Sequence, residues 1–418
     1  MIIKHELSKI ARTLILPALI GFFIVLNIFI VMSHSDIKED LAVLSNLVDT
    51  YGYEVDDGML TEFGADYKQK VAWVNQVAPD KGEPYQHPSE LLSDDEFRFD
   101  NILSESEFQK LLKYGLIEGY YRTAQNIDET YQDINLEGTA KSLIRMYGFK
   151  GEAADSIRDQ FEQLDVRLDQ LIENGEHKNL FFMGKLYQMH SLLFKDLGRA
   201  LIFELIILVV LITASITNYE FENRTHLVSY TSKRGRKLVQ NKLAAAAIAN
   251  LGVIAILIGT TLAAYFFTYD YTGLWQVPIS SYFNAEMPLP YISWWNFSFL
   301  EYLGLFVLCI TLCQLLFMGI SFILSVFIKN TYLVFFAFAI LLGIGVLIPG
   351  FVPLDTNMVF AMYFNPFALI MNPHGWWMGN GAFTIYSYYE MATISIWALI
   401  LVVLCGLSMY FFNRQQLQ

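Results

Sequence analysis

The chain combines six long apolar runs with one long polar stretch that separates the first run from the second. Each run approaches the roughly 20 apolar residues that a membrane-spanning helix needs. We therefore predict an all-α polytopic membrane protein with six transmembrane helices and a helical extracytoplasmic domain. The predicted crossings are residues 13–33, 200–217, 244–267, 300–327, 331–350 and 391–412.

This pattern predicts three parts. Residues 1–34 form an N-terminal interfacial helix and the first crossing, which is longer than a signal-peptide core and has no small-residue cleavage site after it. Residues 35–197 form the extracytoplasmic domain, and about 160 residues are enough to bury a core of their own. Within that domain, residues 106–127 and 157–174 show the spacing of amphipathic helices. Residues 198–418 hold the remaining five crossings.

Basic residues indicate the orientation, because they gather on the cytoplasmic side of membrane proteins. With the N-terminus inside, the outer loops 268–299 and 351–390 contain no Lys or Arg. We therefore expect both termini in the cytoplasm of a cell, with the chain in its plasma membrane and residues 35–197 outside. The basic residues on the inner side are Lys4, Lys9, Arg12, Arg224, Lys233, Arg234, Arg236, Lys237, Lys242, Lys329 and Arg414.

Charge is unevenly distributed along the chain. The whole protein is 54% hydrophobic and 17% charged, whereas soluble proteins carry about 25% charged residues. Residues 35–197 contain 32 Asp and Glu against 16 Lys and Arg, and the rest of the chain contains 9 against 12. A strongly acidic block argues against nucleic acid as a partner, because phosphates repel it.

The two outer loops are rich in aromatic residues, which favour the membrane–water boundary. Interfacial anchoring of short re-entrant or surface helices is the favoured interpretation, and substrate contact by some of the rings is the alternative. The rings are those of Trp275, Trp294, Trp295, Trp376, Trp377, Tyr386, Tyr388 and Tyr389.

Few ionisable residues fall within the predicted crossings. Glu204 lies near the outer start of the second crossing, where it is a possible gate or polar contact of a transport pathway; pairing with Arg199 or a neighbouring helix is the alternative. Cys309 and Cys313 share a helix face, and we expect them to pack as small apolar side chains rather than to hold a metal. Glycines near the end of the fifth crossing, Gly343 and Gly345, indicate close packing.

The segment between the second and third crossings, residues 218–242, is the most distinctive candidate site. Apolar residues recur through its first half, so it can lie along the inner surface with its bases near anionic lipid. A plain positive-inside anchor is the alternative. Its charged residues are Glu220, Glu222, Arg224, Lys233, Arg234, Arg236, Lys237 and Lys242.

This segment resembles the corresponding part of the type-2 (ABC-2) export permeases of ABC transporters. The resemblance rests on acidic residues at the end of one helix, the run Ser232-Lys233-Arg234-Gly235-Arg236, and Lys242 at the start of the next helix. The basic start MIIKHELSKIAR is similar to the family's interfacial helix. The resemblance implies that residues 218–242 form a coupling helix that docks on a separate ATPase subunit. It also implies a dimer, with a second copy or a paralogue. The insert of about 160 residues departs from many members and resembles Gram-positive peptide-export and self-immunity permeases.

The chain cannot supply the energy for transport itself. No G-x-x-x-x-G-K-[ST] phosphate-binding loop occurs in it, so ATP and Mg are expected on the partner ATPase and no cofactor in this chain. No hydrolase or metalloprotease motif occurs either, and we predict no catalytic residues and no metal ligands.

These features together predict the permease subunit of an ATP-driven exporter. Its expected substrate is a peptide or an amphipathic, lipid-like molecule, since an acidic outer domain suits a cationic amphiphile. The alternative is a sensor or immunity protein that binds a ligand through residues 35–197 without transporting it.

Overall fold

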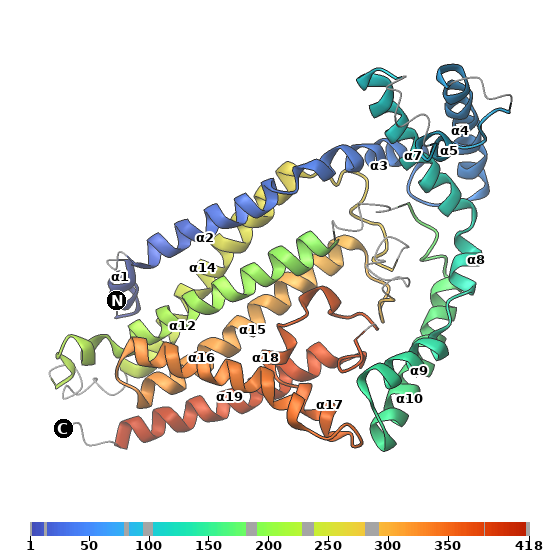
Figure 1. Cartoon of the computed structure of the whole chain (residues 1–418). Helices are drawn as coiled ribbons and strands as arrows, with labels where there is room; N and C mark the ends of the chain where they lie inside the picture. Colours follow the sequence, from blue (N-terminus) through green and yellow to red (C-terminus); the bar gives the residue numbers. More distant parts are fainter. Residues whose placement is uncertain are drawn as a thin grey trace.

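The structure is a computed structural model that describes residues 2–11, 15–78, 83–94, 103–180, 190–227, 238–280, 292–379 and 381–414. Within these ranges the chain is helical and has no β-strand, only three isolated β-bridges. The all-α prediction is confirmed. A short helix, α1 (Ile2–Ala11), precedes the first long one, and the two ends of the chain lie at the same end of the molecule (Figure 1).

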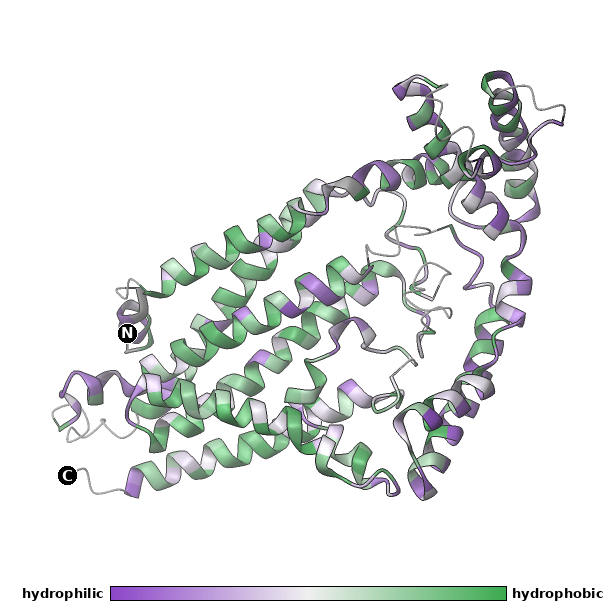
Figure 2. Ribbon diagram, in the orientation of Figure 1, coloured by the Kyte–Doolittle hydropathy of each residue, from purple (hydrophilic) through white to green (hydrophobic). Residues whose placement is uncertain are grey.

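Six helices are long and apolar enough to cross a membrane, as predicted. Figure 2 shows them as a bundle of mostly hydrophobic ribbons. The chain is therefore a multi-pass membrane protein. The six are α2 (Ile15–Met32), α12 with the turn η3 before it (Ser191–Glu222), α14 (Leu238–Thr268), α15 (Phe299–Phe327), α16 with η6 (Thr331–Phe351) and α19 (Tyr389–Arg414).

The second crossing begins earlier than predicted. Residues Ser191–Leu197 form a wide π-type turn, η3, that continues without a break into α12 (Gly198–Glu222). The predicted boundary at residue 197 therefore falls inside a helix. The charges of Lys195 and Asp196 made the sequence before residue 198 look unlike a crossing. The helix of 32 residues is about 48 Å long, however, and so exceeds the roughly 30 Å hydrocarbon core, which allows charged residues near its end.

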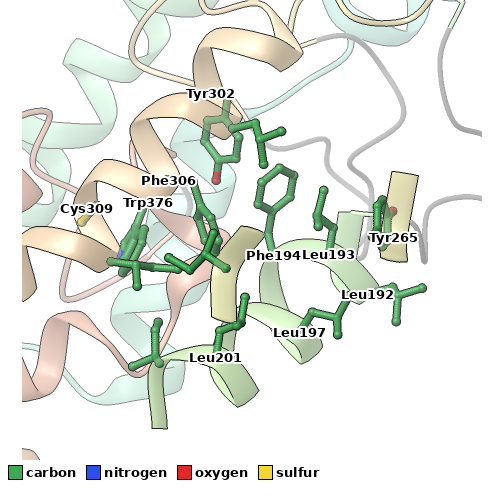
Figure 3. Close-up of a cluster of buried hydrophobic side chains, with 14 of the residues drawn as sticks. Leu192, Leu193, Phe194, Leu197, Leu201, Tyr265, Tyr302, Phe306, Cys309 and Trp376 are labelled. Carbon is green, nitrogen blue, oxygen red and sulfur yellow. The ribbon is translucent and has the colours of Figure 1, made fainter. Parts of the chain in front are cut away.

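Helix α12 is the centre of the bundle. It packs against α14, α15, α16 and α2, and 72% of its most apolar stretch is buried, compared with 17% for α16 and for α19. Near its start, the ring of Phe194 lies 4.8 Å from that of Tyr302 and 4.9 Å from that of Phe306, measured between centroids (Figure 3). Close packing of this kind holds helices together where lipid removes the hydrophobic driving force.

The polar stretch folds into helices beyond one end of the bundle, as predicted (Figure 1). In α10 the predicted apolar positions, from Ile157 to Leu171, are all buried. The predicted helix 106–127 is interrupted at Asn126, which ends one helix and begins the next. The helices are α3 (Lys38–Tyr51), α4 (Asp57–Val77), α5 (Pro88–Leu92), α7 (Glu105–Gln125), α8 (Ile127–Gln132), α9 (Leu136–Tyr147) and α10 (Gly151–Glu173).

The polar helices do not bury a single core of their own, contrary to expectation. Helices α4, α5 and α7 enclose a small cluster around Val74, Leu91 and Leu111. The buried face of α8, α9 and α10 is instead completed by residues of the two outer loops, among them Val359 and Ile385. Residues of α3, α4 and α7, such as Phe63, also belong to the large apolar cluster of the bundle, so the polar helices share their buried surfaces with the rest of the protein.

The loop after α16 turns back into the bundle. It contains α17 (Met358–Tyr363), α18 (Pro366–Leu369) and η7 (Pro373–Gly375), and α18 packs between α16 and α19. Trp376 and Trp377 are only 2% and 6% exposed, so they belong to the protein core and not to a membrane-surface anchor. Tyr389 is also buried, whereas Tyr388 is exposed.

Two glycines of α16 offer a matched test of this packing. A side chain at Gly345 collides with the ring of Phe367 in α18, whereas the space around Gly343 is open. We expect Gly345→Ala to destabilise the detergent-solubilised protein by about 1–3 kcal/mol, as overpacking does, and Gly343→Ala to leave it unchanged or more stable. Thermal unfolding checks both variants, and equal melting temperatures would contradict the packing of α18 against α16.

Candidate functional site

The predicted coupling residues divide between the described and the undescribed parts of the chain. Glu220 and Glu222 lie in the last turn of α12, Arg224 lies two residues beyond the end of that helix, and Lys242 lies in the second turn of α14. The remaining four predicted residues, Lys233, Arg234, Arg236 and Lys237, lie outside the described residues.

Glu220 and Lys242 form a buried ion pair. The Lys242 ammonium donates to Glu220 Oε2, to the carbonyl oxygen of Ile216 at 2.7 Å and to that of Thr217 at 3.0 Å. Lys242 is 0% exposed and Glu220 is 3% exposed. An ammonium group has three donors, and all three are used here. The pair therefore fixes the end of α12 against the start of α14, near the two ends of the 218–242 segment.

Helix α1 joins this pair through a second lysine. Lys9 Nζ lies 2.7 Å from Glu220 Oε1 and 2.7 Å from Glu6 Oε1, and 4.6 Å from the centre of the Tyr219 ring. Burial alone lowers the pKa of Lys9, but its bonds to Glu220 and Glu6 outweigh burial and raise the pKa above the usual value. Lys9 therefore stays charged at neutral pH.

These four side chains, Glu6, Lys9, Glu220 and Lys242, make up what we term the buried ion network. Two carboxylates and two ammonium groups balance to zero net charge. Buried charges are costly unless paired, and a buried pair adds little stability over an apolar replacement. We infer that the network is retained because it specifies how α1, α12 and α14 meet.

Sequence reasoning missed Glu6 and did not connect Lys9 with the site. The available signal was local: Glu6 and Lys9 are three residues apart on an amphipathic helix, and Glu6 is the only acid among eleven N-terminal residues. What could not be read from the sequence is the pairing of Lys9 with Glu220, which lies 211 residues further along the chain.

Glu222 and Arg224 stabilise helix ends near the network. Glu222 Oε1 accepts the N–H of Thr331 at 2.6 Å, and so places a negative charge at the N-terminus of α16, where the helix dipole favours it. Arg224 has a φ of 58°, in the left-handed region. The N–H of Thr225 bonds to the carbonyl of Glu220 at 2.8 Å, which completes a Schellman-type helix end.

Lys329 completes the charged surroundings. It lies in the turn between α15 and α16, with its ammonium 4.6 Å from the centre of the Phe221 ring and 4.9 Å from that of Phe412. Burial, with a smaller contribution from the positive charge of Lys242, lowers the pKa of Lys329 to about 8.

Glu204 lies elsewhere and deeper than predicted. It is 13 residues into the second crossing, about 20 Å from Ser191, and only 4% exposed. Its Oε2 accepts a hydrogen bond of 2.8 Å from Asn27 Nδ2 of α2. Asn27 Nδ2 also donates to Thr261 of α14 at 3.0 Å. Arg199 does not pair with Glu204, because it bonds to Met371 and Asn372 of the re-entrant loop.

The described residues contain no group of three His, Cys, Asp or Glu side chains that could hold a metal ion. Cys309, Cys313 and Cys405 are buried free thiols. Comparisons with protein-family models, with curated proteins and with solved structures find no match for this chain. The function must therefore be argued from the geometry. That geometry suits mechanical coupling between helices, since the network joins three helix ends to each other.

The network can be tested by removing one charge or both. Glu220→Gln and Lys242→Met each leave a buried charge unpaired, so we expect each to destabilise the detergent-solubilised protein by about 3–5 kcal/mol. The double variant is expected to lose less than the sum of the two. Unfolding measurements check this, with Glu137→Gln in the exposed Glu137–Lys141 pair as a control that leaves stability unchanged.

Lys329 predicts a dependence on pH. Its pKa is lower in the folded chain than in the unfolded one, so the unfolded chain binds more protons between about pH 8 and 10.5. The cost of burying its charge is therefore fully present below pH 8 and disappears as pH rises. We expect Lys329→Met to be more stable than the natural protein near pH 7, with a difference that shrinks toward pH 10. Melting temperatures of both, with Lys141→Met as control, check the trend.

Proposed function

We propose that this chain is the permease subunit of an ATP-driven ABC-2-type exporter, and that its buried ion network transmits the motion of a partner ATPase to the membrane helices. The single observation that carries the proposal is the joining of α1 to both helices that border the 218–242 segment. Lys9 bonds to Glu220 at the end of α12, and Glu220 bonds to Lys242 in α14.

The bonds of the buried ion network explain how a displacement at one end of the bundle is transmitted to several helices. An ATPase that docks on residues 218–242 and on α1 moves α12 and α14 together, because separating them breaks buried charge pairs. Glu222 adds α16 to the moving unit through its bond to Thr331. Since α12 is the most buried helix of the six, its displacement must shift the helices packed around it.

The sequence supports the remaining parts of this proposal. The absence of a phosphate-binding loop requires a separate ATPase to bind ATP and Mg, and six helices make half of a pathway that a second copy or a paralogue completes. The distribution of basic residues supports a proposed orientation with both termini, and so the ion network, on the cytoplasmic side of the cell membrane, with Gram-positive bacteria the favoured source. A peptide or amphipathic lipid-like molecule is the proposed substrate.

Copurification tests the docking role directly. The natural chain, tagged and extracted from its own cells in mild detergent, is expected to bring down a protein that contains a nucleotide-binding motif, identified by mass spectrometry. Arg234→Glu with Arg236→Glu is expected to reduce that recovery by about tenfold or more, because charge reversal at an interface costs several kcal/mol.

The matched control reverses two exposed basic residues at the other end of the molecule, Lys141→Glu and Arg145→Glu in α9. This variant is expected to recover the ATPase as well as the natural chain does. Equal recovery with all three proteins would show that the basic loop does not dock an ATPase. No ATPase with the natural chain would favour the sensor or immunity function instead.

A further inference from the structure

A second buried polar cluster, separate from the ion network, lies inside the bundle. It joins three helices through Glu204 of α12, Asn27 of α2 and Thr261 of α14. The exposed fractions of these side chains are 4%, 0% and 1%. Asn27 lies 12 residues and about 18 Å from the start of α2, so the cluster is well inside the roughly 30 Å hydrocarbon core.

The hydrogen bonds of this cluster are incomplete in a specific way. Both protons of the Asn27 amide nitrogen are used, one on Glu204 Oε2 and one on Thr261 Oγ1. Two buried oxygens, Glu204 Oε1 and Asn27 Oδ1, have no hydrogen-bond partner among the described residues. Buried polar atoms are nearly always satisfied, so two unpaired acceptors on two side chains that are already bonded require a donor.

Within the described residues, Glu204 also has no cationic partner. Helix α2 contains no ionisable side chain, and Lys242, the only basic residue of α14 within the described part of the chain, pairs with Glu220, about 24 Å further along α12. Arg199 of α12 bonds to the re-entrant loop. The other ionisable groups on elements packed against α12 are Lys4, His5, Glu6 and Lys9 of α1, Lys195 and Asp196 of η3, Tyr265 of α14, Glu301, Tyr302, Cys309 and Cys313 of α15, Tyr332 of α16 and His374 of η7.

We propose that Glu204 is a proton-binding site within the membrane, where its neutral acid form is held by Asn27, whose amide is itself positioned by Thr261. A carboxylic acid and a primary amide can form two opposed hydrogen bonds, N–H to one carboxyl oxygen and O–H to the amide oxygen. A proton on Glu204 Oε1 provides the missing donor, and Asn27 Oδ1 is the available acceptor. The same proton removes an unpaired charge, which is costly in this environment.

The position of the site gives the proton a structural effect. Asn27 is the residue through which α2 reaches both α12 and α14 inside the bundle, and α2 connects α1 at one end to the polar helices at the other. The bound proton therefore completes the hydrogen bonds that join α2 to α12 and α14. Loss of that proton leaves an anion, and water or a cation must then enter the contact between α2 and the two other helices to stabilise it. This inference does not depend on an ATPase partner.

Infrared spectroscopy of the full chain in lipid vesicles near neutral pH tests the proposal. A neutral carboxylic acid has a C=O stretching band that is separate from the bands of carboxylates and amides. We expect one such band to be lost in Glu204→Gln and to shift in Asn27→Leu, which removes its hydrogen bonds. The band must persist unshifted in Glu390→Gln, a matched change at another buried glutamate, 3% exposed, in α19.

Thermal stability provides an independent measurement. A glutamine side chain resembles the neutral form of glutamic acid in shape, so we expect the Glu204→Gln variant to fold normally. As pH rises, the natural protein must lose the proton and with it stability, so its melting temperature should fall relative to that of Glu204→Gln. An acid band that survives in Glu204→Gln and ignores Asn27→Leu, together with parallel pH profiles of the two proteins, would overturn the proposal.

Discussion

The requirement that buried charge be paired governs one end of this molecule. Four side chains from three helices meet there with no net charge, and the central ones are almost completely removed from solvent. Apolar contacts are not directional, whereas an ammonium group with three acceptors is fully bonded only when those acceptors stay in place. Glu220 and Lys242 therefore add a directional constraint to the apolar packing among α1, α12 and α14.

The same requirement has a different solution in the middle of the bundle. Glu204 has amide and hydroxyl neighbours but no cation, so its charge is neutralised by a proton where Glu220 is neutralised by lysine. The two glutamates lie on one helix, α12, which every other crossing except α19 contacts extensively. Glu220 is neutralised by lysine side chains of the same chain, and Glu204 by a proton that can leave.

The membrane frame could be predicted because its cause is local. A run of about 20 apolar residues crosses a bilayer whatever the rest of the chain does, and the register of α10 follows from the spacing of Ile157 and Leu164 alone. Contacts between distant residues could not be predicted. Nothing near Glu220 in the sequence points to Lys9, and nothing near Glu204 points to Asn27.

Two errors had identifiable causes. Lys195 and Asp196 interrupt the apolar run, which delayed the predicted start of the second crossing and placed Glu204 too near the membrane surface. Trp376 and Trp377 lie in a loop whose aromatic content is typical of a membrane-surface anchor. Aromatic content alone does not distinguish a membrane interface from a protein core. Their burial depends on the return of the loop into the bundle, which α18 and Gly345 make possible.

The shared core beneath α8, α9 and α10 has a consequence for signalling across the molecule. These helices are sealed by residues from the loops that enter α15 and α19, and Lys150 bonds to the backbone of Leu354 at 2.9 Å. A molecule that binds α9 or α10 therefore also contacts, through this shared core, the loops that lead into those membrane helices. The polar region is therefore a continuation of the transmembrane bundle and not a separate unit joined to it by two linkers.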